Sequence, residues 1–169
     1  MHPPRRHMTG LAHDDLQLID ALEPAQFDAA RHLFLDYAAQ LGIDLQFQKF
    51  DLELGDLPRM YGPPTGALLL LLRGATAVGC GALRAASPGV CEMKRLYVRD
   101  GERGARQGHR IVVGLLERAR ALGYREMVLD TLPDMAAARA VYRSFGFRET
   151  APYYRNPIPE TIYMRLSLV

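Results

Sequence analysis

Apolar and polar positions in the first third of the chain predict a strand followed by an amphipathic helix. Residues 15–21 carry a short apolar run typical of a strand. Pro24 suits the first turn of a helix, and Gly42 suits its end. Between them, apolar residues recur at steps of three and four: Phe27, Ala30, Phe34, Tyr37 and Leu41. Residues 44–64 are broken at Leu57-Pro58 and again at Gly62-Pro63-Pro64, which predicts a short helix or an irregular loop.

The middle of the chain predicts three strands. Residues 67–73 and 76–85, separated by Gly74-Ala75, are typical of an antiparallel hairpin. Residues 91–98 alternate as a third strand. Uninterrupted alternation places its side chains in two sets, Cys91, Met93, Arg95 and Tyr97 on one face and Glu92, Lys94, Leu96 and Val98 on the other.

The last third continues the alternation of helices and strands. A loop over 99–108 leads into a helix that Gly123 ends, and its apolar stripe comprises Ile111, Leu115, Ala119 and Leu122. Residues 126–131 predict a short strand. Pro133 then opens a helix that Gly146 closes. A bend at 156–159 precedes a final strand at 161–168. The order of elements predicts one α/β domain.

Length and composition fit this single domain. The 169 residues are 49% hydrophobic and 24% charged, an ordinary globular profile. We expect residues 13–169 to form the domain and residues 1–12 to be a flexible tail. The notable apolar run Ala67–Leu72 has six residues, far short of the roughly 20 that cross a bilayer. No apolar segment follows the N-terminal arginines, so we expect a cytoplasmic protein without membrane partners.

Cysteines and histidines give no sign of a metal. Cys80 and Cys91 could form one disulfide, and in a reducing compartment they are more simply two small buried side chains. The five histidines are scattered, and no CxxC motif is present. We therefore expect no metal site.

Charge is concentrated in the middle of the sequence. Residues 94–125 carry a net charge of +6, whereas the rest of the chain carries −4. This distribution favours an anionic ligand held at one place, although a solvated arginine-rich helix face is the alternative. Aromatic residues are not interleaved with these arginines, so we expect no nucleic-acid partner.

The segment from Leu96 to Tyr124 combines a strand, a basic glycine-containing loop and a helix. Amides at the start of a helix lack intrahelical acceptors, and the helix dipole adds positive charge there. Arg103, Arg106 and Arg110 add full charges nearby. The segment therefore predicts a phosphate-binding site.

Three segments, in this order, resemble the GNAT superfamily, the Gcn5-related N-acetyltransferases: CEMKRLYV at 91–98, RGARQG at 103–108 and ARAVYRSFGF at 138–147. The resemblance runs from about Leu68 to the C-terminus. It implies a mixed, mostly antiparallel sheet flanked by helices, with strands splayed at the cofactor site. It also implies acetyl-CoA as co-substrate and direct transfer to the primary amine of a small molecule or peptide.

The resemblance implies a cofactor site on the central strand and on the loop that follows it. Its residues are Leu96, Tyr97, Val98, Arg103, Gly104, Ala105, Arg106, Gln107, Gly108, His109 and Arg110. Two positions depart from the family pattern. Arg106 stands where the first loop glycine is expected, and a glycine there can adopt a positive φ. Met135 stands where many members carry asparagine.

The resemblance also implies two proton carriers. Glu92 matches a catalytic glutamate that deprotonates the amine, and Tyr142 matches the acid that protonates the departing thiolate. The alternatives are structural: an ion pair for Glu92 and core packing for Tyr142.

The acceptor is hardly specified by the sequence. Acidic residues between 36 and 60 would suit a cationic amine, or they are simply solvated. Tyr153, Tyr154 and Asn156 precede the last strand, a segment that often borders the acceptor in the family. A CoA-binding module with weak or no turnover is the alternative function, and the sequence leaves a homodimer open.

Overall fold

The computed structural model describes residues 15–104 and 106–169, so the expected tail at 1–12 lies outside the described residues. The described residues form seven strands, five α-helices and two 3-10 turns. The strands are β1 (Leu16–Asp20), β2 (Ala67–Arg73), β3 (Thr76–Ser87), β4 (Val90–Val98), β5 (Glu126–Thr131), β6 (Arg148–Thr150) and β7 (Ile162–Ser167). The helices are α1 (Pro24–Leu41), α2 (Phe50–Gly55), α3 (Leu57–Tyr61), α4 (Gln107–Ala121) and α5 (Ala136–Ser144), and the 3-10 turns are η1 (Gln46–Gln48) and η2 (Asp100–Glu102).

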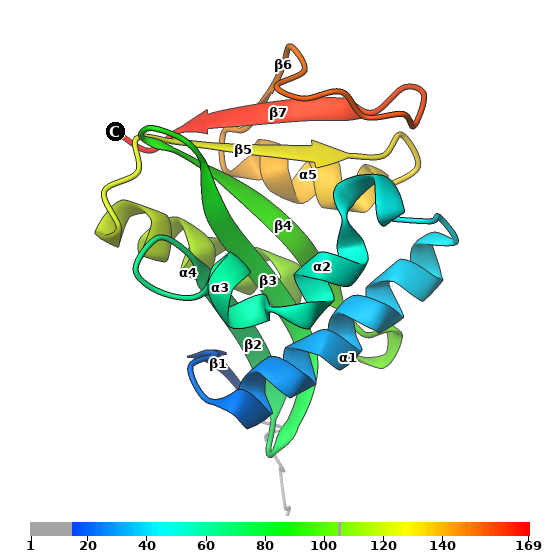
Figure 1. Cartoon of the computed structure of the whole chain (residues 1–169), viewed down its shortest axis with the longest axis vertical. Helices are drawn as coiled ribbons and strands as arrows, with labels where there is room; N and C mark the ends of the chain where they lie inside the picture. Colours follow the sequence, from blue (N-terminus) through cyan, green and yellow to red (C-terminus); the bar gives the residue numbers. More distant parts are fainter. Residues whose placement is uncertain (1–14, 105) are drawn as a thin grey trace, which may run out of the picture.

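One mixed sheet organises the domain, in the order β1-β2-β3-β4-β5-β7-β6. Only the β4–β5 pair is parallel, so the expected mostly antiparallel sheet is confirmed. Helices α1, α2 and α3 lie on one face and α4 and α5 on the other (Figure 1). Each face has its own apolar core, one centred on Phe34 and Leu70 and the other on Ile111 and Leu69.

The helix ends predicted at glycines are confirmed, whereas the helix start predicted at Pro133 is wrong. Gly42 ends α1 in the left-handed conformation, with φ of 63°, and Gly123 follows α4 with φ of 85°. By contrast, α5 begins at Ala136, so Pro133 lies in the turn before the helix rather than opening it. The three-residue strand β6 is not predicted by the sequence because it is too short for a detectable alternation.

A bulge in β4 changes which side chains share a face. Arg95 has φ of 60°, and the β3–β4 register shifts there, so Arg95 and Leu96 together oppose Gly81. Beyond the bulge, Leu96 joins Met93 on the α4 face, while Arg95 and Tyr97 join Glu92 and Lys94 on the α1 face. The predicted alternation is therefore wrong from Arg95 onward, because a left-handed residue reverses the side-chain direction.

Glycine is required opposite this bulge. A Cβ placed on Gly81 would approach Ile111 Cγ2 to 2.7 Å and Leu115 Cδ1 to 3.0 Å. The absence of a side chain therefore lets α4 pack directly on the sheet where β4 bends.

The two central strands separate shortly after they begin. Backbone pairing between β4 and β5 covers only Val90–Glu92 against Glu126–Val128. The bulge begins three residues further along β4, at Arg95, and the two strands continue without pairing. This divergence confirms the expected splay and leaves space between strands in the middle of the sheet.

Both cysteines are buried and free, as expected from the sequence. Burial raises the pKa of Cys91 to about 12. Among the described residues, no helix is both long and apolar enough to cross a membrane.

A buried ion pair holds the bulge against α2. The Arg95 guanidinium donates from Nε and Nη2 to Glu53 Oε2 at 3.1 and 2.9 Å, and both side chains are almost fully buried. Glu53 also accepts the Tyr61 O–H. Arg95 lies over the Tyr37 and Phe50 rings, with its Cζ atom 5.8 and 5.2 Å from the ring centroids.

Removing the acidic partner should destabilise the protein strongly. Glu53→Ala leaves the Arg95 guanidinium buried without a counter-ion, and we expect a loss of about 3–5 kcal/mol in the free energy of unfolding, measured by urea denaturation. Asp51→Ala, an exposed change in the same helix, is the control, with an expected loss below about 1 kcal/mol. Equal losses in the two variants would refute the importance of the pair.

Candidate active site

A small cavity lies where β4 and β5 diverge. Its volume is about 50 Å³, and we call it the deep cavity. Met93 and Leu96 line it from β4, Asp130 and Thr131 from β5, and Tyr142 from α5. The wall of the deep cavity is therefore built from both strands of the splayed pair.

Tyr142 contributes both to packing and to the cavity wall. Its ring lies against Phe147 in an edge-to-face arrangement with centroids 5.8 Å apart. Burial raises the pKa of its phenol above the usual value, so the hydroxyl stays protonated at neutral pH. Both expectations for Tyr142, a packed ring and a protonated phenol at the site, fit this position.

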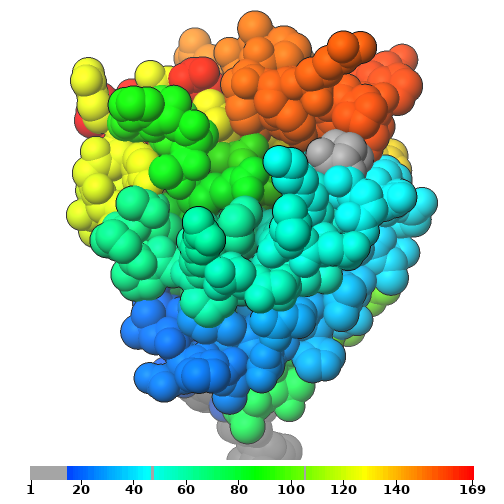
Figure 2. All heavy atoms as spheres, in the orientation of Figure 1, coloured from blue at the N-terminus to red at the C-terminus, as the bar shows by residue number. Residues whose placement is uncertain are grey.

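A larger opening lies on the α1 face of the same strands. It measures about 730 Å³, and its lining includes Glu92 and Lys94 of β4, Arg84 of β3, Tyr153, and Arg59 of α3. We call it the groove. In Figure 2 the cyan and teal segment with α2 and α3 borders this region on one side and the orange loop before β7 on the other.

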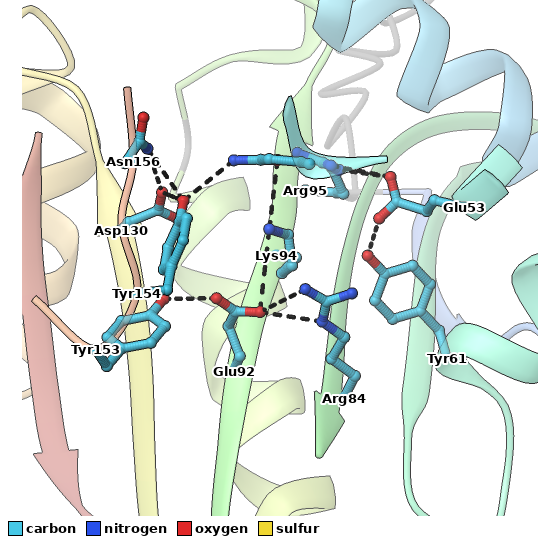
Figure 3. Close-up of polar contacts among 11 residues, drawn as sticks. Glu53, Tyr61, Arg84, Glu92, Lys94, Arg95, Asp130, Tyr153, Tyr154 and Asn156 are labelled. Carbon is cyan, nitrogen blue, oxygen red and sulfur yellow. Dashed lines mark hydrogen bonds and ion pairs between the residues drawn. The ribbon is translucent and has the colours of Figure 1, made fainter. Parts of the chain in front are cut away.

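Glu92 lies at the floor of the groove with every carboxylate oxygen in a polar contact. Oε1 accepts from Arg84 Nε at 3.0 Å, and Oε2 accepts from the Tyr153 hydroxyl at 2.6 Å. Lys94 Nζ is 4.0 Å from Oε1. The structure thus contains the ion pair that was the structural alternative for Glu92, and this buried carboxylate also lines the groove (Figure 3).

A chain of polar contacts separates the groove from the deep cavity. Lys94 Nζ donates to Gln48 Oε1 at 3.4 Å, and Gln48 Nε2 donates to the Tyr154 hydroxyl at 3.3 Å. The Tyr154 hydroxyl in turn donates to Asp130, which also accepts from Asn156 Nδ2 at 3.1 Å. Lys94 and Gln48 line both the groove and the deep cavity, so the two openings meet at this partition.

Burial affects the ionisation of this partition. Loss of solvent lowers the pKa of Lys94, and the nearby Glu92 carboxylate only partly opposes this effect. The phenols of Tyr153 and Tyr154 have pKa values raised by burial and by Glu92 and Asp130 respectively. Both phenols therefore act as hydrogen-bond donors to carboxylates at neutral pH.

The three arginines expected near the phosphate differ in whether their side chains are free to bind a ligand. Arg103 donates to the Val98 carbonyl at 2.9 Å and to Gln40 at 2.6 Å, so it fastens the loop to the end of β4. Arg110 donates to the Leu16 carbonyl at 2.8 Å. Arg106 forms no ion pair within the described residues and is exposed. Of the three expected phosphate ligands, Arg106 is the one whose charge is not committed to the protein.

The start of α4 suits an anionic ligand. The first turn of α4 holds no acidic residue, and the amides of this turn have no acceptor within the helix. Arg106, Gln107 and His109 line an open hollow of about 400 Å³ beside it. In the described part of the chain, Gln107 Oε1 here and Thr131 Oγ1 at the deep cavity are buried without a hydrogen-bond partner. The Gln107 oxygen can only accept a hydrogen bond, so it fits a donor group of a ligand and not a phosphate oxygen.

The acids between 36 and 60 do not form an acidic acceptor surface. Glu53 alone among them lines the groove, and it is buried and held by Arg95 and Tyr61. Asp36, Asp44, Asp51 and Asp56 line neither the groove nor the deep cavity. Asp36 pairs with an exposed arginine, while Asp44 and Asp56 cap local turns. These four aspartates therefore fit the alternative interpretation of solvated acids, whereas Glu53 fits neither interpretation because it is buried in an ion pair.

Sequence reasoning found part of the site and missed the rest. It named Glu92, Tyr142 and the segment with Tyr153, Tyr154 and Asn156. It did not assign roles to Arg84, Lys94, Gln48 and Asp130. One signal could have identified Arg84. It lies directly opposite Glu92 in the β3–β4 hairpin, so the correct strand register would have predicted this pair of opposite charges. Among the described residues, no group of three or more potential metal ligands clusters.

Comparison with known proteins gives a consistent family. The model of the acetyltransferase (GNAT) family matches residues 27–147. An uncharacterised N-acetyltransferase from Schizosaccharomyces pombe is 45% identical over 147 residues, covering 86% of this chain and 90% of the relative. An IAA acetyltransferase from Azospirillum brasilense is 33% identical over 107 residues, covering 62% of this chain and 70% of the relative.

Solved structures share the fold. A GNAT-family acetyltransferase from Staphylococcus aureus has a TM-score of 0.76 at 17% identity, with 91% of this chain and 99% of that chain covered. A Salmonella typhimurium protein assigned as an acetyltransferase, solved with its cofactor acetyl-CoA, has a TM-score of 0.67 at 18% identity, with 92% and 95% covered.

The backbone at Arg106 leads to a stability prediction. Its φ of 62° is left-handed, a conformation that costs an L-residue about 1–2 kcal/mol and costs glycine almost nothing. The greater entropy of glycine in the unfolded chain offsets part of this gain. We therefore expect Arg106→Gly to raise the free energy of unfolding by about 0.5–1 kcal/mol. Arg155→Gly, at an exposed position without positive φ, should lower it by a similar amount. A loss in both variants, measured by urea denaturation, would contradict strain at Arg106.

Proposed function

Because the chain belongs to the acetyltransferase (GNAT) family, we propose that it transfers the acetyl group of acetyl-CoA directly to the neutral primary amine of a small molecule or peptide. The observation that carries this proposal is the meeting of two openings at the β4–β5 divergence. The deep cavity and the groove share Lys94 and Gln48, so two substrates could approach one point from different sides.

The end of β4 and the start of α4 are the proposed donor site. Amides of Leu96, Tyr97 and Val98 lie beyond the last β4–β5 pair and would hold the acetyl carbonyl and the pantetheine arm. The first-turn amides of α4 and the Arg106 guanidinium would hold the pyrophosphate. When bound, acetyl-CoA supplies an activated thioester carbonyl.

The proposed proton transfers occur at opposite ends of the site. As the new bond between carbon and nitrogen forms, the amine loses a proton, and Glu92 in the groove is the proposed acceptor. Arg84 and Tyr153 occupy the two carboxylate oxygens, so the proton would reach Glu92 through an intervening water. As the bond between carbon and sulfur breaks, the Tyr142 hydroxyl would protonate the thiolate.

Acceptor-dependent release of CoA thiol tests the function and its donor site together. With acetyl-CoA and a panel of primary amines, we expect thiol release that depends on the amine. Gly108→Pro removes one amide at the second helical position, so CoA affinity measured by calorimetry should fall about tenfold or more. Gly108→Ala is the matched control, because a Cβ there meets no atom within 4 Å and the amide is kept.

Two outcomes would redirect this proposal. Tight CoA binding without any amine-dependent thiol would favour a CoA-binding module instead of an enzyme. Unchanged CoA affinity in folded Gly108→Pro would remove the α4 start from the donor site.

The two proton carriers should give different kinetic signatures. Tyr142→Phe keeps the ring against Phe147, so we expect CoA affinity to be retained while kcat falls about 10²-fold. Because burial raises the pKa of Tyr142, this deficit should persist throughout the neutral and mildly alkaline range. Glu92→Gln should instead lower kcat/KM most at low pH and recover as rising pH deprotonates the amine.

Structural roles would produce other results. A Tyr142→Phe variant that loses CoA binding or unfolds would assign this residue to packing. A Glu92→Gln variant with the wild-type pH profile would assign the glutamate to its ion pair with Arg84.

A further inference from the structure

The groove carries more positive charge than its acids neutralise. Four basic side chains line it: Lys49, Arg59, Arg84 and Lys94. Its two acids, Glu53 and Glu92, are both buried. A groove of about 730 Å³ with this balance would attract an anionic ligand and repel a cationic one.

Neither acid is a free ion-pair partner for a ligand cation, because each is already paired with an arginine. Glu53 accepts two hydrogen bonds from Arg95, which lies outside the groove, and a third from Tyr61. Glu92 is held by Arg84 and Tyr153. Because Glu53 neutralises an arginine outside the groove, the net positive charge of the groove is larger than its four basic and two acidic side chains suggest.

Two of the cations have no acidic partner in the described part of the chain. Lys49 and Arg59 are exposed, and neither forms an ion pair with a described residue. Lys94 is buried, and its nearest acidic oxygen is 4.0 Å away. The rim of the groove thus offers two uncommitted charges, while its floor holds a third that is poorly neutralised.

We infer that the acceptor is a small primary amine that also carries a carboxylate, which Lys49 and Arg59 bind at the rim of the groove. The inference rests on the proposed acetyl transfer. The amine would then point towards Glu92 and Lys94, where the second opening begins. Burial of this floor disfavours an ammonium ion and so favours the neutral amine that attacks the thioester.

The same charges exclude other acceptors. A diamine or polyamine would place a second ammonium against Lys49 and Arg59 without an acid to receive it. A neutral amide analogue would fit the same volume but lose the charge-assisted hydrogen bonds that a carboxylate accepts.

The test compares ω-amino acids of two to six carbons with their own carboxamides, which differ mainly in charge. For at least one chain length, we expect kcat/KM for the acid to exceed that for the amide by about tenfold or more. Raising the salt concentration from 50 to 200 mM should weaken this preference.

The double variant Lys49→Gln/Arg59→Gln tests the two cations. In this variant the ratio of kcat/KM for the acid to kcat/KM for the amide should fall towards one. Arg148→Gln, an exposed change on β6 away from the groove, should keep the wild-type ratio.

A binding measurement separates this inference from the proposed function. Calorimetry with the N-acetylated acids and N-acetylated amides requires no turnover. Acid-selective binding that the double variant loses, without acetyl transfer to any amine, would overturn the enzyme function and support the groove. Amides or diamines acetylated as well as the acids would overturn the inference and leave the function standing. Neither turnover nor acid-selective binding would overturn both.

Discussion

The left-handed turn of the backbone at Arg95 is the constraint on which the rest of the site depends. A positive φ in a central strand is unfavourable for arginine, so the surrounding structure must stabilise it. The ion pair with Glu53 and the Tyr37 and Phe50 rings do this from the α1 face. Gly81 accommodates the bend from the neighbouring strand. Since all these contacts are buried, the strand cannot straighten without leaving a charge unpaired.

Two consequences follow from this one residue. The reversal of faces places Glu92 and Lys94 with Arg95 and Tyr97, so one face of β4 is polar over most of its length. The bend also lies three residues beyond the last pair between β4 and β5, which leaves the strands unpaired at the level of Leu96. Polar groups that would be costly in a packed sheet interior therefore lie beside open space, and they satisfy one another along the partition.

Local signals predicted the elements, and distant contacts determined what the sequence could not reveal. Gly42 and Gly123 gave correct helix ends because their left-handed conformation is a local requirement. The bulge is different, because the residue at its centre is an arginine and its strain is supported by α2, some forty residues away in the sequence. Glu92 and Tyr142 came from resemblance, whereas Arg84 and Asp130 depend on strand register, which alternation alone does not specify.

Arg95 and Arg106 share a left-handed backbone, yet their side chains have opposite roles. Arg95 is buried and paired with Glu53, so the fold holds its left-handed backbone in place, and this backbone bends the strand. Arg106 caps the start of α4, where its carbonyl accepts the Arg110 amide at 3.0 Å, while its exposed side chain forms no ion pair within the described residues. A phosphate at the start of α4 would supply an ionic partner for this guanidinium, so the proposed donor site, like the splayed strands, would depend on an arginine with a left-handed backbone.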